Sequence, residues 1–115
     1  MKSYNGFTPK QREKAARIQR EAIEAGIMKS PNECRCTICG QDKGIRHYHN
    51  EDYSDEAILS NARVVCWRCH MMIHSRFEHP LSFAKYMIDV VLYKKRFKPV
   101  YRGNDWDALN EHYID

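Results

Sequence analysis

The chain has 115 residues, 43% of them hydrophobic, so its length suits a single domain with a modest core. No stretch resembles the apolar part of a signal peptide or a membrane-spanning helix. With five cysteines present, these features predict a cytoplasmic protein of a reducing compartment, without disulfide bonds and without a membrane partner. The net charge of +4 is mild, so its distribution along the chain is more informative than its size.

A helix is predicted within the first 30 residues. Thr8 followed by Pro9 is typical of a helix start, because threonine caps free backbone N–H groups and proline suits the first helical position. Small and branched apolar residues then recur at helical spacing from Ala15 to Ile23, and Gly26 provides a stop. Residues 1–30 are therefore expected to form an N-terminal helical arm.

Two C-x-x-C pairs frame the polar middle of the chain, at Cys36 and Cys39 and at Cys66 and Cys69. Four thiolates form a complete ligand set for a tetrahedral structural Zn²⁺ ion, and zinc binding would add to the free energy of folding. Cys34 is the odd cysteine. A glycine follows the first pair and relieves its tight turn, which favours Cys36 over Cys34 as the ligand.

Four histidines lie on elements predicted between and after these pairs. A strand is expected at 45–49, and His47 and His49 share one of its faces because side chains alternate along a strand. An acidic loop at 50–60 and a second strand at 63–65 lead into the second cysteine pair.

A helix is then expected from Cys69 to about Phe77, with Pro80 as its end. His70 and His74 are four residues apart on this helix, so both could bind one ion.

The C-terminal third is predicted to be helical. A long helix is expected from Ser82 to near Pro99, and a short one over 105–113, anchored by Trp106 and Leu109. Residues 84–102 contain six cations and one acid; the cations are Lys85, Lys94, Lys95, Arg96, Lys98 and Arg102. Such a stripe suits a phosphate backbone, and it equally suits a solvated helix face.

The stretch from Cys36 to His74 resembles the HNH endonuclease family. The shared pattern is C-x-x-C-G, a histidine about ten residues later, Asn61 five residues before the second pair, and C-x-x-C-H-x-x-x-H. The string H-N-E-D-Y-S at 49–54 is also similar to one found in some phage and bacterial members. The resemblance covers about a third of the chain.

This resemblance implies a small α+β fold, with a zinc-stapled ββα-metal core at 33–78 inside one domain of residues 1–115. The N-terminal arm at 1–30 and C-terminal helices at 80–115 would flank the core. It also implies a metal-dependent endonuclease that hydrolyses DNA phosphodiester bonds with low sequence specificity, in a bacterial or phage-infected cell. The enzyme would contact the minor groove and the phosphate backbone, alone, as a homodimer or with a protein partner.

The resemblance also implies residue roles. His49 would be the general base and Asn61 would orient the loop that carries it, while His70 and His74 would bind a second divalent ion such as Mg²⁺, Mn²⁺, Ni²⁺ or Zn²⁺. The family pairs two adjacent residues where this chain has His47-Tyr48-His49. Two assignments stay open: His47 binds the ion and His49 is the base, or His47 is the base. The alternative function is a non-catalytic zinc-binding module for nucleic acid or protein.

Overall fold

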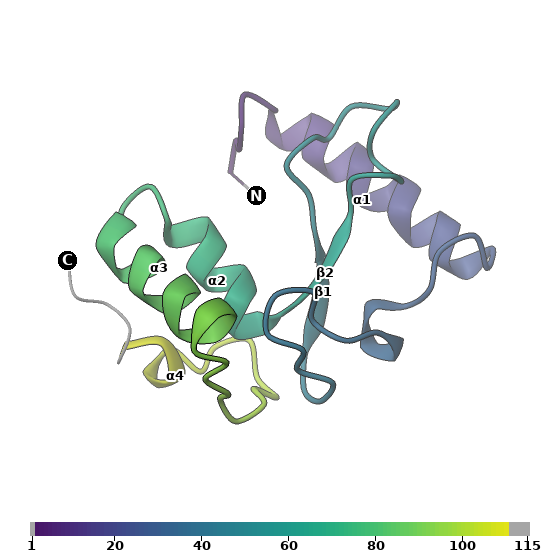
Figure 1. Ribbon diagram of the computed structural model, residues 1–115. Helices are drawn as coiled ribbons and strands as arrows, with labels where there is room; N and C mark the ends of the chain where they lie inside the picture. Colours follow the sequence, from purple (N-terminus) through teal and green to yellow (C-terminus); the bar gives the residue numbers. More distant parts are fainter. Residues whose placement is uncertain (1, 111–115) are drawn as a thin grey trace. The chain divides into compact units, whose positions relative to one another are not determined.

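The computed structural model describes residues 2–110 (Figure 1). Among these residues it contains four α-helices and one two-stranded sheet, so the mixed α and β content predicted from the sequence is confirmed. No helix within this range is long and apolar enough to cross a membrane. The chain divides into two compact units, one combining Met1–Ser30 with Tyr48–Arg63 and the other combining Pro31–His47 with Val64–Asp115. Residues 48–63, which were expected in the core at 33–78, thus group with the N-terminal arm.

The first unit is built on helix α1 (Pro9–Glu24). Its predicted start is confirmed, because the Gln11 N–H donates to Thr8 Oγ1 at 3.2 Å and the Thr8 N–H donates to Gln11 Oε1 at 2.8 Å. This reciprocal pair satisfies two N–H groups that a helix start leaves free. Gln19 Nε2 then donates to Asn50 Oδ1 at 2.7 Å and to the Ile58 carbonyl at 2.9 Å. These bonds attach the predicted acidic loop to the helix.

Strands β1 (Arg46–His49) and β2 (Arg63–Cys66) form the sheet, close to their predicted positions. The start of β1 is fixed by the buried Arg46 side chain, whose guanidinium donates to the carbonyls of Asn32, Cys34 and Gly44. A short 3₁₀ turn, η1 (Pro31–Glu33), precedes this strand. Because three carbonyls use its N–H groups, Arg46 stabilises the fold here.

Helix α2 (Trp67–Ser75) begins two residues before the predicted start, and Cys66 is its N-cap. The prediction that Pro80 ends this helix is wrong, because Pro80 is the first residue of the next helix, α3 (Pro80–Met87). Proline is well tolerated there since the first N–H groups of a helix have no partner within it. α2 packs against both α3 and α4 (Asp107–Asn110).

The predicted long helix to Pro99 is also wrong. α3 continues into a wider π-helical segment, η2 (Ile88–Leu92), and this continuous helix ends there. Lys94 then adopts a left-handed conformation with φ of 57°, and the Lys95 N–H bonds to the Asp89 carbonyl at 2.8 Å, which turns the chain away. The final helix, α4, begins at Asp107, two residues later than predicted, and positions 111–113 of that prediction lie outside the described residues.

The core of the second unit surrounds the four cysteines of the two C-x-x-C pairs. Trp67, Met72, Tyr86 and Leu109 are each at most 2% exposed. The Tyr86 ring stacks on Phe97, with centroids 5.8 Å apart, so the segment after η2 also packs on this core.

Gly44 lies where this returning segment meets the start of β1. The Ile45 N–H donates to the Val100 carbonyl at 2.8 Å. A Cβ atom at Gly44 would lie 2.5 Å from that same carbonyl oxygen, and the φ of Gly44 is +74°. Both the contact and the backbone conformation therefore require glycine.

We predict that Gly44→Ala lowers the Tm more than Gly40→Ala does. Gly40 also has a positive φ of +80°, but nothing lies within 4 Å of a Cβ there. Both variants should incur the left-handed backbone cost of about 1–2 kcal/mol, and only Gly44→Ala adds the clash with Val100. Thermal unfolding followed by circular dichroism measures the difference. Equal losses would show that the Val100 contact does not constrain position 44.

Candidate metal centre

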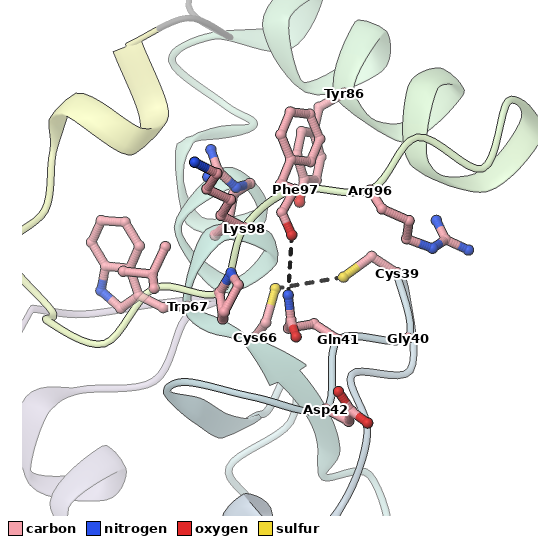
Figure 2. A pocket seen from close by; sticks show the side chains of 13 residues that line it. Cys39, Gly40, Gln41, Asp42, Cys66, Trp67, Tyr86, Arg96, Phe97 and Lys98 are labelled. Atoms are coloured by element: carbon pink, nitrogen blue, oxygen red, sulfur yellow. Dashed lines mark hydrogen bonds between the residues drawn. The ribbon is translucent and has the colours of Figure 1, made fainter.

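The four cysteine thiols of the second unit converge at one point. The Sγ atoms of Cys36, Cys39, Cys66 and Cys69 all lie within 4.8 Å of one another, and all four residues are buried. The Cys39 and Cys66 Sγ atoms are 3.7 Å apart (Figure 2). Ligands at about 2.3 Å from a tetrahedral zinc ion lie about 3.8 Å from one another. The cluster could therefore bind a zinc ion.

Hydrogen bonds around the cluster suit thiolates. The Cys39 N–H donates to Cys36 Sγ at 3.5 Å, and the Cys69 N–H donates to Cys66 Sγ at 3.4 Å. The Tyr86 hydroxyl lies 3.0 Å from Cys69 Sγ. Burial, followed by the charge of Cys69, raises the pKa of Tyr86, so it stays a donor. Such outer contacts orient metal ligands and stabilise their charge.

Without a bound cation, the pKa values of the four cysteine thiols shift in opposite directions. Hydrogen bonds from Cys39 and its neighbours lower the pKa of Cys36, whereas a hydrogen bond to Cys36 and burial raise the pKa of Cys69. A divalent cation would allow all four to lose their protons, because it offsets their mutual repulsion. The donor chemistry therefore fits zinc.

Cys34 lies outside this cluster, which agrees with the choice of Cys36 from the C-x-x-C-G form. Its carbonyl instead accepts a hydrogen bond from Arg46 Nε at 2.9 Å.

Three of the predicted site histidines lie together in the same unit. The Nε2 atoms of His70 and His74, one turn apart on α2, are 3.0 Å apart. On its other side, His70 Nδ1 lies 3.2 Å from His47 Nδ1. Burial lowers the pKa of His47, which favours its neutral ring. Two imidazoles that bind one ion at about 2.1 Å place their nitrogens about 3.0 Å apart on an octahedral ion and about 3.4 Å apart on a tetrahedral one, so His70 and His74 have suitable spacing.

The other two candidates, His49 and Asn61, belong to the first unit. His49 Nε2 forms a short hydrogen bond with Glu51 Oε2. Asn61 Oδ1 accepts from the N–H groups of Glu51 and Asp52, each at 3.0 Å, and Asn61 Nδ2 donates to the Asp52 carbonyl at 2.8 Å. Asn61 therefore fixes the backbone of the segment that follows His49.

Glu51 is held from the N-terminal side as well. Tyr4 Oη donates to Glu51 Oε2 at 2.6 Å, and Asn5 Nδ2 donates to Glu51 Oε1 at 3.0 Å. Sequence reasoning did not assign Glu51 a role, although its position two residues after His49 was a usable signal. Tyr86 was missed too, and no local pattern could have revealed it, since it is 17 residues from Cys69.

Comparisons with protein-family models, with curated proteins and with solved structures gave no match to this chain.

We predict that Cys66→Ser loses bound zinc and the cooperative unfolding transition, because Cys66 is a cluster member, while the serine hydroxyl can still cap α2. Cys34→Ser is the matched control and should keep both, since Cys34 is not a member of the four-cysteine cluster. Elemental analysis of the purified proteins and circular dichroism measure the two properties. A native melting profile with full zinc content in Cys66→Ser would remove this residue from the ligand set.

Proposed function

We propose that this protein is a metal-dependent endonuclease of the HNH type that hydrolyses DNA phosphodiester bonds. The observation that carries the proposal is the close approach of His70 and His74, at 3.0 Å between their Nε2 atoms, on a helix that begins at the cysteine cluster. Four cysteines would supply a full ligand set for a structural zinc ion, so that ion would not need these imidazoles as ligands.

A divalent ion bound by the two imidazoles would neutralise charge on the phosphate and on the leaving oxygen. Nitrogen ligands suit Zn²⁺ and Ni²⁺, and Mg²⁺ and Mn²⁺ remain candidates from the family resemblance. α2 is capped by Cys66, so the direction in which the two imidazoles point depends on the cysteine cluster.

His47 lies beside Nδ1 of His70, whereas His74 lies beside Nε2 of His70. This arrangement supports a role as the hydrogen-bond partner that fixes the His70 tautomer, leaving Nε2 of His70 for the ion. In this assignment His49 is the base, and the open alternative is that His47 is the base.

His49 would accept a proton from the attacking water. Its hydrogen bond to Glu51 supports this role, because a carboxylate beside an imidazole orients the ring and stabilises the imidazolium that forms. Asn61 would act as a positioning residue, since it binds the backbone N–H groups of Glu51 and Asp52. DNA is the proposed partner, with low sequence specificity, in a bacterial or phage-infected cell.

We predict that His70→Ala weakens binding of a second divalent ion by about tenfold or more while structural zinc is retained. The two sites use different side chains, so one should be lost without the other. Calorimetric titration of Mn²⁺ or Ni²⁺ into the zinc-loaded proteins measures the affinity, and His79→Asn is the control because His79 precedes α3 and is outside the histidine group. Unchanged affinity in His70→Ala would exclude it as a ligand.

We predict that the zinc-loaded protein nicks plasmid DNA when Mg²⁺, Mn²⁺ or Ni²⁺ is added, and that His49→Ala is slower by roughly 10²–10⁴-fold, the usual contribution of a positioned base. His47→Ala should act mainly through metal affinity. The opposite result, with His47→Ala inactive at saturating metal and His49→Ala active, would exchange the two roles. A wild-type protein that binds DNA and never cuts it would favour the non-catalytic zinc module.

A further inference from the structure

The segment after η2 carries a concentrated positive charge. Residues 94–102, called the basic segment from here on, contain five cations and no acid; the cations are Lys94, Lys95, Arg96, Lys98 and Arg102. All five are exposed. Within residues 2–110, no carboxylate forms an ion pair with any of them, whereas Lys85 pairs with Asp89 at 3.1 Å just before the segment. Their charge is thus not neutralised by neighbours in the described chain.

The backbone of the basic segment is fixed although it is not helical. Gln41 Nε2 donates to the Phe97 carbonyl at 3.1 Å, and the Ile45 N–H donates to the Val100 carbonyl at 2.8 Å. Phe97 stacks on Tyr86, and Val100 is only 7% exposed. Figure 2 shows Phe97 beside Tyr86 while the Arg96 side chain extends away from them. The apolar residues therefore hold the segment in place, and the five cations stay exposed, although Arg96 Nη1 donates to the Val90 carbonyl at 3.2 Å.

A hollow of about 220 Å³ lies beside these cations. It is lined by Arg96 and Lys98 together with polar and apolar residues of the cysteine loop and the core, among them Gln41, Trp67 and Pro99 (Figure 2). The cluster residues Cys39 and Cys66 also line the hollow, and its one carboxylate, Asp42, has a cation nearby because Arg35 lies 3.6 Å from it. Three cations, Arg68, Arg96 and Lys98, thus line the hollow.

We propose that the basic segment binds the phosphodiester backbone of nucleic acid, and that it is a second contact surface separate from the histidines. Because the backbone of this segment is already fixed, phosphate binding would need no further ordering of the main chain, and each contact releases condensed counterions. Exposed tyrosines lie just before the segment, at Tyr93, and within it, at Tyr101, and they are 76% and 68% exposed. Aromatic rings beside cations suit nucleic acid better than an acidic protein surface. The inference deepens the proposed function and rests on its substrate class.

The test is fluorescence anisotropy of a labelled 20-base-pair DNA duplex at several salt concentrations, with zinc-loaded protein and no other divalent ion. Lys95→Gln, Lys98→Gln and Arg102→Gln are combined in one variant. For each phosphate contact that is lost, the slope of log affinity against log salt should fall by about 0.9, and affinity at low salt should fall about tenfold or more.

The matched control combines Lys10→Gln, Arg17→Gln and Arg20→Gln, three exposed cations of α1. It removes the same formal charge, so it should change the affinity by less than about threefold if the contacts are local. Equal losses in both variants would show that only net charge matters, and this would overturn the proposal. No loss in the variant of the basic segment would overturn it as well.

Further arms separate the remaining possibilities. Single-stranded DNA and RNA of the same length show which strand form supplies the phosphates, and polyglutamate that competes as well as DNA would overturn the nucleic-acid assignment. Zinc content and the melting profile of each variant confirm that it is folded; if the triple variant unfolds, Lys98→Gln and Arg102→Gln are measured singly by the same criterion. If the wild type does not nick plasmid but the basic-segment variant still binds DNA more weakly than the control variant, only the endonuclease proposal is refuted. If the wild type nicks plasmid but both variants bind DNA equally well, only the inference about the basic segment is refuted.

Discussion

The convergence of four thiols constrains the second unit more than any other interaction. Cys39 and Cys66 are 27 residues apart in sequence, and their Sγ atoms are 3.7 Å apart in space. Because Cys66 is also the N-cap of α2, the same sulfur that belongs to the cluster determines where the helix starts. The positions of His70 and His74 on α2 follow from that start. A change at the cysteines would therefore reach the imidazoles through the helix.

The C-terminal part of the chain completes this arrangement from the other side. Tyr86 contributes a hydroxyl to Cys69 and a ring face to Phe97, so one residue of α3 contacts both the cluster and the returning segment. Backbone bonds at Ile45 and the side chain of Gln41 hold the same segment against the start of β1. The small polar middle of the chain thus gains a core from residues beyond position 80.

Features that depend on local chemistry could be predicted from the sequence. The helix start at Thr8 and Pro9, the two short strands and the convergence of the cysteine pairs all follow from spacing and residue type. The features that were missed depend on tertiary contacts. The early end of helical structure after Leu92 accompanies a turn at Lys94, and the two bonds that position Phe97 and Val100 join residues more than 50 positions apart.

The candidate site shows the same division. The spacing of His70 and His74 was sufficient to place their imidazoles together on one face, whereas the orientation of His47 toward the far nitrogen of His70 depends on how β1 and α2 meet. The role of Glu51 also depends on Tyr4 and Asn5, which are more than 45 positions away. Sequence spacing cannot reveal a hydrogen bond that an N-terminal turn supplies.

The dependence of α2 on a cysteine N-cap has a consequence for the order of folding. A helix of nine residues is too short to be stable in isolation. α2 is therefore stable only in contact with the rest of its unit, and its paired imidazoles depend on the cysteine that caps it. If zinc holds the cysteine cluster together, a shortage of zinc would leave newly made chains without a folded α2. Zinc supply would then set the fraction of molecules that mature.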